Sequence, residues 1–236
     1  MGVKMEINND RRIRRYSIDS PELMHLRTVD EQMDFVIQLI GDLEYWIDRD
    51  PFIHFMNTII GQMLSNKVAD IISDRFLNLC NGSITPEAVC KLSVEDLRSI
   101  GLSRDKSGYL LGFAQYIYDN PRYFDELETL PDKELLSSLQ KHRGIAGWSS
   151  KMYAIFVLDR KDILPFEDGA FLQSFRWLYG VDEKNRNHPI IRKMCEKWSP
   201  YSSLAARYLY RVLDNGYVKR SVDEVKQEIH FSPIRG

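Results

Sequence analysis

Apolar residues recur at helical spacing along most of this chain of 236 residues. After Val29 they fall three or four positions apart, which predicts a helix with one buried face that continues until Pro51 interrupts it. A second long helix is predicted from Phe52 to about Leu79. Period-2 alternation bounded by turn residues is nearly absent, so the pattern predicts an all-α protein. The apolar positions of the first helix are Met33, Val36, Ile37, Ile40, Leu43 and Trp46.

Capping residues and prolines divide the rest of the chain into shorter helices. Thr85 precedes a proline at a first helical position, and Ser93 and Asp96 have the spacing of a capping box, so a short helix is expected after each. Further helices are predicted at about 104–118, 132–140, 189–198, 202–213 and 221–230.

The chain has the length of one large domain or of two small lobes. Residues 1–28 are polar, and a solvated arm is preferred there over a tail that touches phosphates. Residues 29–236 are expected to form one helical domain, with a cleft between a middle lobe, at about 60–165, and a lobe built from the remainder. The basic residues of the arm are Arg11, Arg12, Arg14 and Arg15.

Composition and charge narrow the range of partners. Hydrophobic residues make up 44% of the chain, and the net charge of -2 counts against a protein that coats nucleic acid, so any contact with DNA must be local. Three widely separated cysteines argue against a disulfide framework and against a four-thiolate metal site. No signal pattern appears, and no apolar stretch approaches the roughly 20 residues of a membrane helix. A soluble, intracellular protein without a membrane partner is expected.

A glycine-containing turn between two predicted helices is the first candidate for chemistry. Gly144 and Gly147 permit tight backbone geometry, which would aim successive amides at the start of the second helix, where a phosphate can bind. Between Leu139 and Ile163 five basic residues face two acidic ones, and Lys141, Arg143 and Lys151 lie nearest the turn. A plain helix–helix turn with solvated lysines explains the same residues, so both interpretations stay open.

Asp168 is the second candidate. It follows Leu-Pro-Phe-Glu (residues 164–167) and is expected to open a helix as its N-cap. An aspartate at a helix start commonly accepts backbone amides and does nothing else.

Together these motifs resemble the helix-hairpin-helix DNA glycosylase superfamily. The resemblance lies in Gly-Ile-Ala-Gly-Trp-Ser-Ser (residues 144–150), an apolar helix, and then Leu-Pro-Phe-Glu-Asp (164–168). Segments 59–65, 101–106 and 198–205 are similar, in order, to the 3-methyladenine DNA glycosylase II branch, and the likeness covers roughly residues 51–213. The resemblance implies the helix-hairpin-helix glycosylase fold of two helical lobes.

The resemblance implies that Asp168 is the catalytic carboxylate. Breaking an N-glycosidic bond builds positive charge on the sugar, which an anion stabilises while water is positioned to attack. An N-cap role is compatible with this task, because amide donors hold the carboxylate ionised and fix its direction. Glu167 is expected to be secondary.

The implied partner is double-stranded DNA that contains a damaged base, which must be flipped out of the duplex. Met63 stands where this branch carries a wedge residue, although a core position is an equal alternative. The aromatic base pocket would come from Trp148, Tyr201 and Tyr153, although aromatics at helical spacing are more often core. The hairpin contacts to DNA would come from Gly144, Ala146, Gly147, Lys141, Arg143 and Lys151.

The hairpin departs from the family pattern in two places. The usual Leu-Pro before the first glycine is His142-Arg143, and Gly-Ile-Gly-Pro becomes Gly-Ile-Ala-Gly. His142 is expected to lie beside phosphate or in solvent. Family hairpins often bind a monovalent cation through backbone carbonyls, so Na+ or K+ is the single cofactor considered, with no metal held by side chains.

Two further departures bear on the reaction. Trp148 occupies the position of the nucleophilic lysine of strand-nicking relatives, which favours simple hydrolysis, with a Schiff base at Lys151 as the alternative. The four-cysteine cluster of the endonuclease III branch is missing, and the helical look of the first 50 or so residues gives no support for an N-terminal sheet lobe.

The sequence therefore predicts a monomeric, monofunctional glycosylase for alkylated purines such as 3-methyladenine. Deaminated, mismatched or oxidised bases are alternative substrates for the same scaffold. A non-catalytic DNA-binding repair protein is the alternative from another class. The expected location is the cytoplasm or nucleoid of a bacterium, or the nucleus of a eukaryote.

Overall fold

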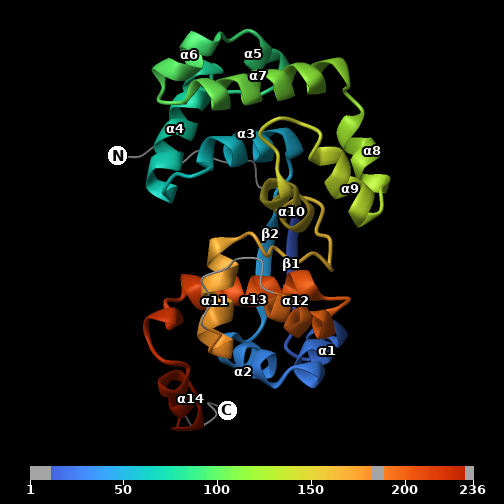
Figure 1. The fold of residues 1–236 in the computed structure, drawn as a ribbon, viewed down its shortest axis with the longest axis vertical. Helices are drawn as coiled ribbons and strands as arrows, with labels where there is room; N and C mark the ends of the chain where they lie inside the picture. Colours follow the sequence, from blue (N-terminus) through green and yellow to red (C-terminus); the bar gives the residue numbers. More distant parts are fainter. Residues whose placement is uncertain (1–11, 182–188, 232–236) are drawn as a thin grey trace. The chain divides into compact units, whose positions relative to one another are not determined.

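The computed structural model describes residues 12–181 and 189–231, so Arg11 of the predicted arm lies outside the described residues. Helices dominate, which confirms the predicted fold class, and the described residues also contain one sheet of two strands. The chain divides into two compact units (Figure 1). We call Met1–Ile47 with Asp159–Gly236 the terminal unit, and Asp48–Leu158 the middle unit.

The middle unit is helical throughout its regular elements. Helix α7 is its longest helix and packs against α3, α5 and α6, while α10 packs against α3 and α9 (Figure 1). The capping threonine and the capping box predicted at Thr85 and Ser93 are confirmed. Its helices are α3 (Pro51–Gly61), α4 (Asn66–Leu79), α5 (Pro86–Cys90), α6 (Val94–Ser99), α7 (Arg104–Asp119), α8 (Tyr123–Thr129), α9 (Asp132–Leu139) and α10 (Gly147–Phe156).

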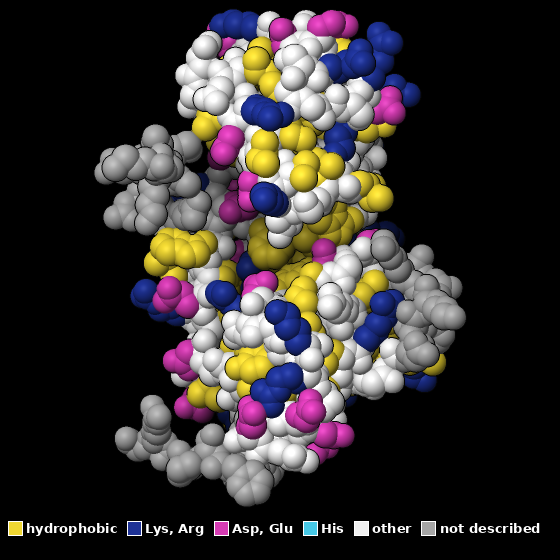
Figure 2. Space-filling view, turned by 90° about the vertical axis from the view of Figure 1, so that its left-hand side faces the viewer, with side chains coloured by type: hydrophobic (Ala, Val, Ile, Leu, Met, Phe, Trp, Pro, Cys, Tyr) yellow, Lys and Arg dark blue, Asp and Glu magenta, His cyan; other side chains and the backbone are white. Residues whose placement is uncertain are grey.

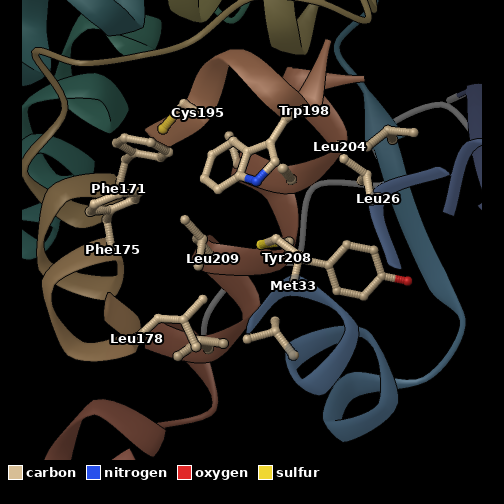
Figure 3. Close-up of a cluster of buried hydrophobic side chains, with 14 of the residues drawn as sticks. Leu26, Met33, Phe171, Phe175, Leu178, Cys195, Trp198, Leu204, Tyr208 and Leu209 are labelled. Carbon is tan, nitrogen blue, oxygen red and sulfur yellow. The ribbon is translucent and has the colours of Figure 1, made fainter. Parts of the chain in front are cut away.

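The terminal unit is organised around α13, which is buried along nearly its whole length and packs against α2 and α11. Figure 3 shows the side chains of this core, where Phe171 and Phe175 of α11 lie beside Trp198. The elements of this unit are β1 (Arg12–Tyr16), α1 (Pro21–Val29), α2 (Glu31–Ile40), β2 (Leu43–Ile47), α11 (Gly169–Tyr179), α12 (Pro189–Cys195), η1 (Glu196–Trp198), α13 (Ser202–Asp214), η2 (Tyr217–Lys219) and α14 (Val222–Phe231).

The two strands correct two predictions. The first helix does not continue to Pro51, because Gly41, at φ 79°, ends α2, and β2 then alternates buried Leu43, Tyr45 and Ile47 with exposed side chains. The solvated-arm interpretation is wrong from Arg12 onward, because β1 pairs antiparallel with β2 and α1 buries its apolar face. Leu43 and Trp46 misled the prediction because a spacing of three also fits a helix.

Asp30 ties several elements of the terminal unit together. Its carboxylate is almost fully buried and caps α2 by accepting the amide of Gln32 at 3.0 Å. It also accepts Tyr179 Oη at 2.6 Å and Trp198 Nε1 at 2.7 Å, and it lies 3.1 Å from Lys197 Nζ. A buried carboxylate that accepts this many hydrogen bonds holds their donors in place. Asp30 therefore anchors the segment that leads from Trp198 into α13.

Surface charge is mixed. On the face drawn in Figure 2, basic side chains are interspersed with acidic ones. This distribution agrees with the net charge of -2. A helix able to cross a bilayer, which would have to be both long and apolar, is absent from the described residues.

Candidate functional site

The hairpin of the middle unit joins α9 to α10 through residues 140–146. Gly144 has φ +86°, and a Cβ added there would lie 2.7 Å from the ring of Tyr109. Both the left-handed backbone and the close approach require glycine at this position, as the sequence predicted. The carbonyl of Gly144 accepts Gln62 Nε2 at 2.7 Å, so the residue that follows α3 also holds this turn.

The outer side of this hairpin suits an anion. Lys141, Arg143 and Ala146 are exposed, while Ile145 between them is buried and anchors the turn. Helix α10 begins at Gly147, and the amides of a first helical turn have no acceptor within their own helix. An anion placed there would meet these amides and the positive end of the helix dipole. Lys151, which is half-buried, lies one turn further along α10.

His142 is not the phosphate-side or solvent residue that the sequence predicted. Its ring is half-buried among aromatic side chains, and its Nε2 lies 2.8 Å from the hydroxyl of Tyr123. The rings of Phe113 and Tyr116 meet it edge to face, with centroids 5.1 and 4.5 Å away. Burial, and then the charge of Lys141, lower the pKa of His142. The sequence misled because the residues on either side of His142, Lys141 and Arg143, are basic, and both are indeed exposed.

Met63 projects from a turn that interrupts the predicted long helix at residues 62–65. Its relative exposure is 101% and its φ is 60°, a left-handed value that is uncommon for a residue other than glycine. The core interpretation of Met63 is therefore wrong. Two contacts fix the residue before it: Lys106 Nζ donates to the Gln62 carbonyl at 2.6 Å, and the Gln62 side chain reaches the hairpin.

Asp168 lies in the terminal unit, where it caps α11 as predicted. Its Oδ1 accepts the amide of Phe171 at 2.8 Å, and its own amide donates to the Pro165 carbonyl at 2.9 Å. The pKa of Tyr210 is raised, first by burial and then by the charge of the Asp168 carboxylate and a hydrogen bond to it. The carboxylate is half-buried, and the amide of Phe171 holds it in direction.

Sequence reasoning missed a buried cation in this unit. Arg207 is 5% exposed, and its guanidinium carbon lies 3.6 Å from the ring centroid of Tyr45. Asp159 lies 3.8 Å from Arg207, accepts Tyr45 Oη at 2.8 Å and pairs with Arg14 at 2.9 Å. Burial lowers the pKa of Arg207, against the opposing effects of Tyr45 and Asp159. The signal available in the sequence was an arginine within an apolar helix, Leu-Ala-Ala-Arg-Tyr-Leu (residues 204–209).

The three predicted pocket aromatics differ in their surroundings. Tyr201 is half-buried at the start of α13, with His25 edge-on at 5.4 Å and Lys161 Nζ 6.0 Å from its ring centroid. Trp148 is half-buried in the first turn of α10. Tyr153 is 1% exposed and its ring stacks on Phe55 at 4.8 Å, so its contacts are those of a core residue.

The predicted site residues thus fall in two groups. Asp168 and Tyr201 belong to the terminal unit, whereas Met63, the hairpin, Trp148 and Tyr153 belong to the middle unit. Among the residues that the structure describes, no three His, Cys, Asp or Glu side chains gather to hold a metal ion.

The architecture and motifs define a helical protein with a glycine hairpin, an exposed apolar turn and an aspartate that caps a helix. The family model described as "HhH-GPD superfamily base excision DNA repair protein" matches residues 56–200. The chain therefore belongs to this superfamily, which confirms the family predicted from the sequence.

Three similar proteins illustrate the relationship. The "alkylbase DNA glycosidase-like protein mag2" of Schizosaccharomyces pombe is 27% identical over 195 residues, which span 80% of this chain and 91% of that protein. The structure of a DNA-3-methyladenine glycosidase from Bacillus halodurans has a TM-score of 0.79 and 27% identity, covering 92% of this chain and 99% of the other. A 3-methyladenine DNA glycosylase of S. pombe, solved in complex with abasic DNA, has a TM-score of 0.71 and 25% identity, covering 83% and 97%.

Proposed function

We propose that this protein is a DNA glycosylase that flips an alkylated purine, such as 3-methyladenine, out of duplex DNA and hydrolyses its N-glycosidic bond. The observation that carries the proposal is Asp168, a fixed carboxylate at the start of α11 in a member of a base excision repair superfamily. The names of the similar proteins, which refer to 3-methyladenine, support the choice of substrate.

In the proposed reaction the hairpin holds the DNA backbone and Met63 enters the base stack. The amide end of α10, with the exposed Lys141 and Arg143, would bind phosphate without reading sequence. Extrusion of a base costs a few kcal/mol, and an unbranched apolar side chain in the gap offsets part of that cost. An exposed Met63 is free to make this contact.

Asp168 would then stabilise the positive charge that develops on the sugar as the bond to the base breaks. Water adds its oxygen to the anomeric carbon of the sugar, the released proton leaves through the carboxylate, and the base departs with the bonding electrons. The products are the free base and an abasic site. Tyr201, which belongs to the same unit as Asp168, would offer an electron-rich ring face to the base, since alkylated purines carry positive charge.

The decisive experiment offers the purified protein duplexes with one defined lesion each: hypoxanthine, ethenoadenine, uracil or 8-oxoguanine. Methylated genomic DNA, analysed for released bases, covers 3-methyladenine. Alkali then cleaves any abasic site. Asp168→Asn should abolish excision, whereas Glu167→Gln, which removes the adjacent carboxylate, should retain most of it.

Each other outcome has a defined meaning. Equal excision by wild type and Asp168→Asn would refute the role of Asp168. Release of deaminated or oxidised bases alone would replace the substrate class, and binding without release would favour a non-catalytic repair protein. Strand breaks without alkali, or an adduct trapped by borohydride, would point to Lys151 and a lyase reaction.

A monovalent cation at the hairpin stays a prediction. The carbonyls of His142 and Gly144 accept the amide of Ile145 and the side chain of Gln62, and the second lone pair of each carbonyl oxygen could bind Na+ or K+. Replacing both ions by choline at constant ionic strength should weaken DNA binding if the site is used.

We also propose that the protein acts as a monomer on DNA in the nucleoid or the nucleus. Sedimentation of the protein with and without a lesion duplex tests the stoichiometry. The cleft that the sequence predicts between the middle lobe and the lobe built from the remainder stays a prediction.

A further inference from the structure

Lys106 makes an unusual pair of contacts inside the middle unit. It stands in the first turn of α7, and its ammonium group donates to the carbonyls of Ile60 at 2.8 Å and Gln62 at 2.6 Å. Both carbonyls lie at the end of α3, where the helix has run out of amides to bind them. A cation at this end also complements the negative pole of the helix. Lys106 therefore takes the place of a helix C-cap.

The turn that Lys106 closes is the one that carries Met63. At Gln62 the backbone leaves the helix with ψ 128°, and Met63 follows in the left-handed region with φ 60°. The side chain of Gln62 donates to the Gly144 carbonyl at 2.7 Å and lies 3.3 Å from Ser149 Oγ. Gln62 is thus held by α7 through its main chain and by the hairpin through its side chain, and Met63 extends outward from this double anchor.

A direct role of Lys106 in DNA binding fits the structure less well. Two of its three N–H donors are already directed at protein carbonyls, and burial lowers its pKa. Lys141 and Arg143, in contrast, are exposed beside the hairpin. The charge of Lys106 is therefore directed at the backbone of the turn.

We propose that Lys106 is a positioning residue for base extrusion: it fixes the Met63 turn against the hairpin before DNA arrives. This inference rests on the proposed function. A preformed turn lets Met63 enter the stack without first ordering its own backbone, so the benefit falls on the extrusion step. Chemistry at the sugar, which depends on Asp168 in the other unit, does not gain from it.

The test compares one lesion in two settings, with the full-length protein under single-turnover conditions. Hypoxanthine opposite thymine must be extruded, whereas hypoxanthine in a one-nucleotide bulge is already unpaired. Lys106→Met, which keeps the apolar stem, should slow excision of the paired base by about tenfold and of the bulged base by less than about twofold. Lys106→Arg should restore most of the loss. The matched control is Lys133→Met, at an exposed lysine of α9, and should match wild type on both substrates.

A double-mutant cycle ties the effect to Met63. If Lys106 acts through Met63, the combination of Lys106→Met with Met63→Ala should be little worse than Met63→Ala alone. Equal losses on paired and bulged substrates, or multiplicative losses in the cycle, would overturn the proposal.

A second readout does not depend on activity. The amide of Leu64 donates to the Gly61 carbonyl at 3.1 Å, so hydrogen exchange at this amide reports on the turn. Exchange at Leu64 should accelerate in Lys106→Met, and also in Lys106→Gln should the methionine variant fold poorly, but not in Lys133→Met. Unchanged exchange in a folded variant would refute the inference. If wild type releases no base from any substrate, the proposed function fails while this measurement still decides the structural role of Lys106.

Discussion

Replacing Gly144 by alanine tests how strongly the hairpin depends on its backbone geometry. The left-handed φ of +86° costs a residue with a Cβ about 1–2 kcal/mol. The new Cβ would also lie 2.7–2.8 Å from the Cδ2, Cγ and Cβ atoms of Tyr109, and such overpacking costs about 1–3 kcal/mol. Because the Cβ of Tyr109 is fixed to the α7 backbone, the side chain cannot swing away. We expect Gly144→Ala to lower the free energy of unfolding by about 2–5 kcal/mol.

The chain supplies a matched control for this change. Gly108 and Gly112 lie within α7, and a Cβ added at either meets nothing within 4 Å. Alanine at Gly112 should stabilise the protein by about 0.5–1 kcal/mol. Urea unfolding followed by circular dichroism measures both variants, and DNA binding should fall with Gly144→Ala alone. A Gly144→Ala variant that loses less than about 1 kcal/mol would refute the argument, since the backbone cost alone is about 1–2 kcal/mol.

Four other substitutions test the packing and ion pairs of the two units by urea unfolding. Asp30→Ala should lower the free energy of unfolding by about 3–5 kcal/mol, because it leaves buried donors without their acceptor. A loss below about 1 kcal/mol would contradict this prediction. The lowered pKa of His142 means that the unfolded chain binds the proton more readily, so stability should fall as pH drops through about 6.5. His142→Phe should flatten the dependence of stability on pH between about pH 7.5 and 5. An unchanged dependence would refute the role of His142. Arg14→Met should lower the free energy of unfolding by about 1 kcal/mol or less, and Arg207→Met by about 3–5 kcal/mol. Arg14 lies nearer to Asp159, but it is half-exposed, whereas Arg207 is buried. Equal losses would show that distance outweighs burial here.

Local signals in the sequence predicted most of the helices. Thr85 and Ser93 cap as expected, and Asp168 opens α11, because capping depends on residues three positions apart. The small sheet escaped prediction because its strands, 12–16 and 43–47, are short and pair across α1 and α2. One segment carries both patterns. Leu43 and Trp46 have helical spacing, whereas Leu43, Tyr45 and Ile47 alternate as in a strand. Pairing with β1 makes the segment a strand.

The candidate site shows the same division between local and distant causes. Gly144 was predictable because a tight turn demands glycine whatever surrounds it. The positions of His142 and Arg207 were not, because an aromatic shell and a buried ring from other segments determine them. For Met63 the sequence left core and wedge equally open, since a helix interrupted for four residues keeps nearly the same apolar spacing. The exposure of Met63 rules out the core interpretation, and the wedge role stays a prediction.

The distribution of charge explains how an acidic protein can hold DNA. Two basic residues are already engaged within their own units: Lys106 is directed at two carbonyls and Lys161 at Glu22. Exposed Lys141 and Arg143 remain on the hairpin, beside the amide end of α10. Amides and a helix dipole attract phosphate without adding net charge, so their binding displaces few of the cations condensed on the DNA. If DNA binding depends on a preformed hairpin rather than on a basic surface, as proposed, it should vary weakly with salt, and the affinity should depend on the backbone of Gly144 and the anchor at Gln62.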